Sequence, residues 1–205
     1  SASVLVGVWA VSILFAGLQK RQIFVLFVGA VVACLFAWQF LLADYQQARL
    51  LTFFHPAIDP LGGGYNVAQS VIAIGSGGWF GSGLGFGSQS QLKFLPEAQT
   101  DFIFAVIGEE LGFVGIGVLL AAEFLLFFRL YKWARRAPDN FTAYLLIGIG
   151  SVYFIQFVIN VGMNLGLFPV TGIGLPLVSY GGSSIVFLLF LLGIAQSIAM
   201  RTRWS

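Results

Sequence analysis

The chain has 205 residues, of which 59% are hydrophobic and only 9% are charged, with a formal net charge of +2. Roughly a quarter of the residues of an ordinary soluble domain are charged, so this composition excludes a soluble fold. The 26 glycines fit the same conclusion, because glycine is common where transmembrane helices pack closely or bend.

Five stretches are long and apolar enough to cross a bilayer, which takes about 20 residues. They cover residues 1–18, 23–42, 102–130, 141–165 and 182–200. They predict an all-α integral membrane protein with five transmembrane helices, forming one polytopic domain over residues 1–205. The first stretch has no leader charge and no cleavage-site pattern, so we expect a spanning helix rather than a signal peptide, and a chain that is a fragment.

Basic residues predict the orientation of this bundle. Eight of the ten lysines and arginines fall in two short connections and the C-terminal tail, namely Lys20, Arg21, Arg129, Lys132, Arg135, Arg136, Arg201 and Arg203. The positive-inside rule makes these segments cytoplasmic. Residues 43–101 then form a large extracellular loop, and residues 166–181 form a second one.

The large loop is far longer than a usual connection, and its apolar content predicts ordered structure. Residues 66–74 predict a short helix lying along the membrane surface. The glycine-rich segment, residues 75–87, carries Trp79, Phe80, Leu84 and Phe86 and is expected to fold near the lipid headgroups. Its amides are able to cradle phosphate, but close backbone packing explains the glycines equally well.

Two acids precede the third predicted helix. Asp101 stands directly before it, where an aspartate makes a good N-cap and is favoured by the helix dipole. Position alone supports a cap and a catalytic acid equally. Glu97 is either a solvated loop acid or a helper of Asp101. His55 is the sole histidine and is best interpreted as a turn residue, which argues against a metal site built on histidine.

Three more acids lie inside the predicted helix. Glu109 and Glu110 are expected about 12 Å below its mouth, where acids need partners or water. Hydrogen bonding to neighbouring helices is favoured for Glu110, while Glu109 is left open between such bonding and a polar cavity. Asn160 and Asn164 are candidate partners. Glu123 is expected to pair with a basic residue near the cytoplasmic end.

Two blocks of sequence resemble a known family. The first comprises YQQAR at 45–49, FHPAIDPLG at 54–62, QSVIAIGSGG at 69–78 and FLPEAQTDFIFAVIGEELG at 94–112; the second is NVGMNLGLFPVTGIGLPLVSYGGSS at 160–184. Both are similar to the SEDS family of RodA- and FtsW-type peptidoglycan glycosyltransferases, and closest to its RodA members. These proteins have ten transmembrane helices, so the resemblance implies that this chain is the C-terminal half, with the last five.

The resemblance also implies an activity. It implies a peptidoglycan polymerase that joins lipid II into glycan strands for cell elongation or division, at the outer face of the bacterial cytoplasmic membrane, with undecaprenyl pyrophosphate as the leaving group. The family's essential aspartate falls on Asp101, which becomes the catalytic candidate. Some relatives carry an acid eight residues earlier, where this chain has Lys93, so no role of that acid transfers.

Supporting roles in binding the substrate or its pyrophosphate are expected for Glu97, Lys93, Arg49, Glu109, Ser179 and Tyr180. A divalent cation, Mg²⁺ or Mn²⁺, is an alternative aid to the leaving group, with Asp101 and Glu97 as its oxygen ligands. The expected partners are a class B penicillin-binding protein, lipid II, the lipid-linked glycan strand and membrane lipids, and no nucleic acid.

Two rival hypotheses remain at this stage. One is a transporter that flips the lipid-linked precursor, with Glu109 and Glu110 along its path and Asp101 as a gate. The other is a scaffold without catalytic activity that holds the penicillin-binding protein. Acids gathered outside the bilayer favour polymerisation, whereas acids spread through the bilayer favour transport.

Overall fold

The computed structural model describes residues 4–8, 20–40, 63–91, 94–95 and 97–201. These residues are helical apart from turns and loops, and none of them lies in a strand. Beside a helical turn at residues 4–8, the elements are α2 (Lys20–Phe40), α4 (Gly63–Ser76), α5 (Ser88–Gln91), α6 (Ile103–Arg135), α7 (Asn140–Asn164) and α8 (Gly182–Arg201).

Within the part of the chain that the structure describes, three helices are long and apolar enough to cross a membrane: α6, α7 and α8. They confirm the predicted spans at 102–130, 141–165 and 182–200. The predicted span at 23–42 overlaps α2 over residues 23–40, and the apolar stretch Phe24–Ala33 lies within this helix. The first predicted span lies largely outside the described residues, so the count of five stays a prediction.

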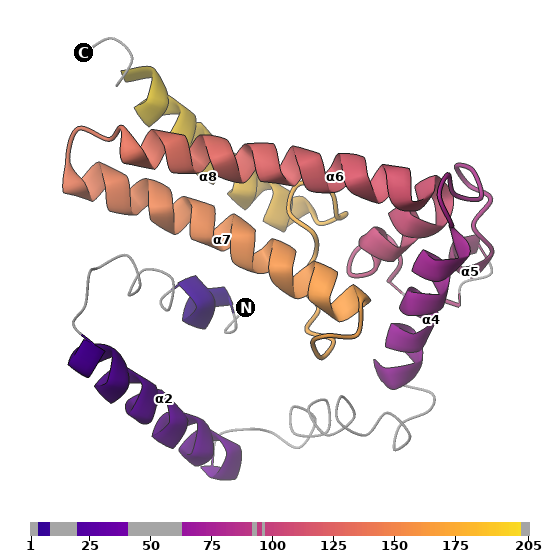
Figure 1. Cartoon of the computed structure of the whole chain (residues 1–205), viewed down its shortest axis with the longest axis horizontal. Helices are drawn as coiled ribbons and strands as arrows, with labels where there is room; N and C mark the ends of the chain where they lie inside the picture. The colour runs from indigo at the N-terminus through magenta and orange to yellow at the C-terminus, as the bar shows by residue number, and fades with distance from the viewer. Residues whose placement is uncertain (1–3, 9–19, 41–62, 92–93, 96, 202–205) are drawn as a thin grey trace.

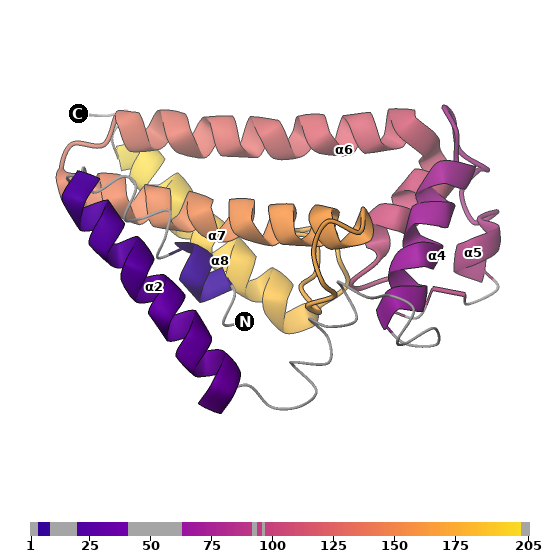
Figure 2. The same cartoon turned by 60° about the horizontal axis from the view of Figure 1, so that its bottom comes forward.

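The three long helices pack around a shared apolar core. In Figures 1 and 2, α6 and α7 run side by side in opposite directions, and α8 packs beside α7. Leu130 of α6, Leu146 of α7 and Leu188 of α8 are almost fully buried in this core. The hydroxyl of Tyr153 donates a hydrogen bond to the Leu188 carbonyl at 2.5 Å, which ties α7 to α8.

The short helix predicted at residues 66–74 is confirmed by α4. Both views show α4 running across the direction of α6 (Figures 1 and 2). If α6 crosses the bilayer, this orientation is the one expected of a helix lying along the membrane surface. Ser70 and Ala73 are fully buried, while Val71 and Ile72 are exposed, so α4 presents one packed face and one open face.

Helix α6 is interrupted at Gly112. This residue has φ 64° and ψ −162°, a backbone conformation that essentially only glycine adopts. A β-carbon here would lie 2.4 Å from the Gly81 nitrogen, so backbone from the glycine-rich segment occupies the space of a side chain. The break divides α6 into a short part, residues 103–111, and a long part, residues 113–135.

The glycine-rich segment supplies hydrogen bonds that the interrupted helix lacks. Two amides after the break donate to the segment, and two amides of the segment donate to carbonyls before the break. These bonds are Phe113 N–H to Gly78 O at 2.9 Å, Val114 N–H to Trp79 O at 3.1 Å, Ser82 N–H to Glu109 O at 2.9 Å and Gly83 N–H to Glu110 O at 3.0 Å. Helix ends leave such groups unpaired, so the segment completes the helix. Close backbone packing explains Gly77 and Gly81, where a β-carbon would lie 1.9 Å from the Gly108 carbonyl oxygen and 2.1 Å from that of Glu110.

The large apolar side chains of the segment are exposed. Trp79, Phe80, Leu84 and Phe86 are all exposed, and the Trp79 ring packs edge-on against Phe113 with centroids 5.3 Å apart. Their predicted location near lipid headgroups stays a prediction.

The break makes a first testable prediction. Gly112→Ala is expected to destabilise the full-length protein by about 3 kcal/mol, because alanine disfavours this backbone conformation and its methyl group overlaps Gly81. The matched control is Gly117→Ala on the same helix, where a β-carbon meets nothing within 4 Å. Thermal unfolding in detergent measures both. Equal midpoints for the two variants would contradict the account of the break.

Candidate active site

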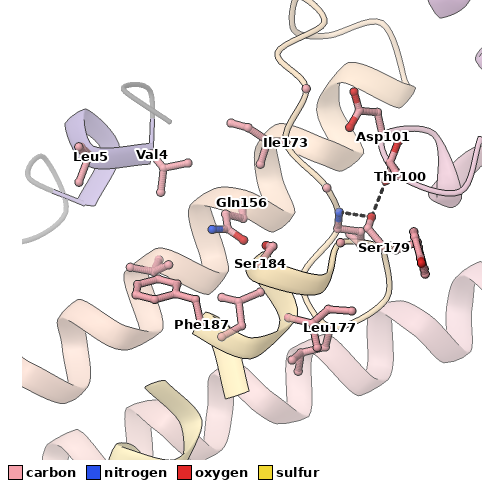
Figure 3. A pocket seen from close by; sticks show the side chains of 18 of the residues that line it. Val4, Leu5, Thr100, Asp101, Gln156, Ile173, Leu177, Ser179, Ser184 and Phe187 are labelled. Atoms are coloured by element: carbon pink, nitrogen blue, oxygen red, sulfur yellow. Dashed lines mark hydrogen bonds between the residues drawn. The ribbon is translucent and has the colours of Figure 1, made fainter. Parts of the chain in front are cut away.

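A cavity of about 540 Å³ lies between α7, α8, loop 166–181 and the helical turn at residues 4–8. Figure 3 shows Val4 and Leu5 on one side, Gln156 and Phe187 in the middle, and Asp101 at the opposite end. Among the described residues that line the cavity, Asp101 is the only carboxylate. The lining is mostly apolar, with polar side chains such as Gln156 and Ser184 beside the single carboxylate.

Asp101 is presented by a tight turn. The Glu97 carbonyl accepts from the amides of Thr100, Asp101 and Phe102 at 3.1, 3.1 and 3.3 Å. Glu97 has φ 57°, so the turn depends on a conformation that few residues with side chains adopt. The N-cap of α6 is Phe102, which makes no side-chain cap hydrogen bond. The interpretation of Asp101 as the N-cap of this helix is therefore wrong.

Two buried asparagines hold the backbone of Asp101. The Nδ2 groups of Asn160 and Asn164 donate to the Asp101 carbonyl at 2.9 and 3.0 Å. Both side chains are fully buried. These bonds differ from the prediction that the pair would serve the acids Glu109 and Glu110.

Loop 166–181 is fastened to the same turn. The Ser179 hydroxyl donates to the Thr100 carbonyl at 2.5 Å and accepts from the Leu175 amide at 2.6 Å (Figure 3). The Tyr180 amide donates to the Gln99 carbonyl at 2.9 Å. Ser179 and Tyr180, both predicted from the sequence, thus line the cavity together with Asp101. Ser179 is buried and fastens the loop, whereas the Tyr180 side chain is exposed.

Two of the other predicted site residues, Glu97 and Glu109, are described by the structure, and neither lines this cavity. Glu97 is exposed, accepts a hydrogen bond from the Thr100 hydroxyl at 3.0 Å, and is not among the lining residues. Arg49, Lys93 and His55 lie outside the described residues. The supporting roles of Glu97, Arg49 and Lys93 stay predictions.

Glu109 is fully buried away from the cavity lining. Its carboxylate accepts from the Gln89 amide at 2.7 Å and from the Ser88 hydroxyl at 3.4 Å, at the start of α5. The expected depth of Glu109 and Glu110 assumed one continuous helix. The break at Gly112 comes after both acids and separates them from the long part of α6, so their depth stays a prediction.

Glu123 lies in the long part of α6 and is 5% exposed. Its Oε2 has no hydrogen-bond partner among the residues that the structure describes. The predicted pairing with a basic residue is therefore not observed in this part of the chain.

Comparison with known proteins gives consistent matches over nearly the whole chain. The sequence model of the family described as "Cell cycle protein", which is named for FtsW, RodA and SpoVE, matches residues 1–204. Peptidoglycan glycosyltransferase MrdB of Escherichia coli K12 is 47% identical over 197 residues, which are 96% of this chain and 53% of the relative. Stage V sporulation protein E of Bacillus subtilis 168 is 41% identical over 206 residues, with 100% and 55% covered. The chain thus spans about half the length of these curated relatives.

A solved structure has the same fold. It is described as "Structural coordination of polymerization and crosslinking by a peptidoglycan synthase complex". The TM-score is 0.76 at 32% identity, with 97% of this chain and 55% of the other covered. The all-helical membrane architecture predicted from the sequence is confirmed by this likeness.

Proposed function

Because the chain belongs to the cell cycle protein family of FtsW, RodA and SpoVE, we propose that it forms part of a peptidoglycan glycosyltransferase. Its substrate is lipid II, and its product is a lipid-linked glycan strand made for cell elongation or division. The observation that carries the proposal is the cavity of about 540 Å³ that holds Asp101 as the one carboxylate among its described lining residues.

Asp101 is the general base of the proposed reaction. Its carboxylate takes the proton from the acceptor sugar hydroxyl, whose oxygen attacks the anomeric carbon of the donor. The new glycosidic C–O bond forms as the C–O bond to pyrophosphate breaks. The leaving group departs as undecaprenyl pyrophosphate and carries the bonding electron pair. Asp101 is left protonated and returns its proton to water before the next cycle.

A divalent cation fits the donors near this site. No group of three or more His, Cys, Asp or Glu side chains gathers among the described residues. Mg²⁺ is commonly held by one or two carboxylates together with substrate phosphates, and Asp101, with Glu97 as a second candidate, meets that need. When bound, such a cation would neutralise charge on the departing pyrophosphate.

The distribution of charge supports an active site outside the cytoplasm. The basic residues of α6 and α8 lie toward their C-terminal ends, at Arg129, Lys132, Arg135 and Arg201. Figures 1 and 2 place these ends together, opposite α4, α5 and the turn that carries Asp101. With positive charge inside, Asp101 faces the extracytoplasmic side of the cytoplasmic membrane.

The placement of acids favours polymerisation over transport. Over the three continuous spans, residues 113–135, 140–164 and 182–201, Glu123 is the only Asp or Glu. A path for a charged lipid-linked precursor needs polar groups along its depth. The other described acids near the proposed outer side precede the long part of α6, as the polymerase hypothesis requires.

A class B penicillin-binding protein is the proposed partner. The matching structure is described as a complex that coordinates polymerisation with crosslinking. A chain that makes glycan strands needs a second activity that crosslinks them, so the proposed partner brings the transpeptidase.

Reconstitution of the full-length protein with its partner tests the proposed function. Purified lipid II in liposomes is expected to give glycan strands that lysozyme digests, in the presence of moenomycin to silence classical transglycosylases. Protein-free liposomes are the control. Translocation of lipid II without strand formation would favour the transporter, and activity that depends only on the partner would favour the scaffold.

A further inference from the structure

Asn160 and Asn164, here called the asparagine pair, join four separate parts of the chain. Their hydrogen bonds reach the turn before α6, the first turn of α6, loop 166–181 and α4. Both residues are fully buried near the end of α7. A buried amide costs free energy unless its donors and acceptor are paired. The hydrogen bonds of the asparagine pair supply that pairing.

The donors of the pair converge on one atom. Asn160 Nδ2 donates to the Asp101 carbonyl at 2.9 Å and to the Ile173 carbonyl at 2.8 Å. Asn164 Nδ2 donates to the same Asp101 carbonyl at 3.0 Å and to the Asn160 carbonyl at 2.9 Å. The Asp101 backbone is thereby fixed relative to α7 and to loop 166–181, which forms another wall of the cavity.

The acceptor of the pair completes the start of α6. Asn164 Oδ1 accepts from the Ala105 amide at 3.2 Å, and the same amide also donates to the Phe102 carbonyl at 3.0 Å. Ala105 is the third residue of α6, where an N-cap side chain would normally accept, and the N-cap residue Phe102 has no such group. Asn164 therefore caps α6 from another helix. The buried Ser70 hydroxyl of α4 donates to the Asn164 backbone carbonyl at 2.9 Å and lies 3.2 Å from Asn164 Oδ1, so it ties α4 to this asparagine.

We propose that the asparagine pair consists of positioning residues for Asp101, which act through its carbonyl and through the cap of α6. The inference rests on the proposed function, because a fixed position of Asp101 affects the rate only if Asp101 takes part in the reaction. A carboxylate that must reach one hydroxyl gains rate from fixed geometry, and a displacement of about 1 Å lowers the rate about 100-fold. The pair therefore sets the turnover number, while substrate affinity depends on other walls of the cavity.

Variants of the full-length protein with its partner test this role. Asn160→Leu removes one of the two donors to the Asp101 carbonyl, together with the hydrogen bond to the Ile173 carbonyl. It is expected to lower kcat for lipid II about 100-fold while KM changes less than threefold. Ser70→Ala keeps both donors to Asp101 and is expected to lower kcat about threefold, and it remains informative if Asn160→Leu does not fold. The control is Ser151→Ala on α7, whose hydroxyl donates only to the Ile147 carbonyl of its own helix among the described contacts.

Hydrogen–deuterium exchange on the same preparations separates this inference from the proposed function. Amides of residues 99–105 are expected to exchange at least tenfold faster in Asn160→Leu than in the wild type or in Ser151→Ala. If the wild type makes no glycan, the proposed function is wrong. The exchange measurement alone then tests whether the asparagine pair holds the turn at Asp101. Unchanged exchange would overturn the inference, as would a loss of activity through KM alone.

Discussion

Replacing Asp101 with asparagine is expected to lower lipid II polymerisation at least about 10³-fold, in the reconstituted full-length protein with its partner. Asparagine keeps the shape of the side chain, but its amide accepts no proton at neutral pH and binds a hard cation poorly. Asp101→Ala is expected to fail equally. Folding and partner binding should persist in both, because the cap of α6 comes from Asn164 rather than from Asp101.

Asp139→Asn is the matched control for this substitution. Asp139 is the true N-cap of α7, and its carboxylate accepts from the Thr142 amide at 3.3 Å. Asparagine caps a helix as well as aspartate does, so activity should stay within twofold of the wild type. If Asp101→Asn retained substantial polymerisation, the catalytic assignment would be wrong, and Glu97 would be the next acid to test.

Removal of divalent cations is expected to lower polymerisation about 100-fold, which corresponds to about 2.7 kcal/mol in the barrier. The physical reason is the charge on the departing pyrophosphate, since Asp101 is the only described carboxylate of the cavity and brings no positive charge. The experiment compares chelator alone with chelator plus excess Mg²⁺ or Mn²⁺. Full activity in the chelator alone would exclude a required cation.

Glu97→Gln decides whether Glu97 is a ligand of that cation. Loss of one carboxylate ligand is expected to raise the Mg²⁺ concentration for half-maximal rate about tenfold, with kcat recovered at saturation. Glu97 is exposed and its carboxylate already accepts from the Thr100 hydroxyl. An unchanged Mg²⁺ dependence would assign Glu97 to the turn alone.

The fold was largely predictable where a single physical quantity decides it. The length of an apolar run predicted α6, α7 and α8 to within a few residues, since about 20 residues are needed to cross a bilayer. The short helix expected at residues 66–74 likewise corresponds to α4. The break at Gly112 was not predictable, because it depends on backbone of the glycine-rich segment that approaches from an earlier part of the chain.

The catalytic candidate Asp101 was predictable from the sequence, but the residues that hold it in place were not. From its position alone, Asp101 was equally well explained as a helix cap and as a catalytic acid. The family resemblance then favoured the catalytic role. Its actual helix cap comes from Asn164, which lies 59 residues beyond Ala105. Two asparagines one turn apart, directly before a glycine- and proline-containing loop, were the available signal. Their role needed the tertiary structure, because their partners are carbonyls and amides that any sequence provides.

The break in α6 also settles how the longest helix suits the bilayer. An unbroken helix of 33 residues measures about 50 Å, against a hydrocarbon core of about 30 Å. Residues 113–135 alone measure about 34 Å, so they match this thickness with only a modest tilt. Without Gly112, the same apolar sequence would have to lean steeply or thicken the lipid around it. The glycine-rich segment thereby adjusts the protein to the thickness of its membrane.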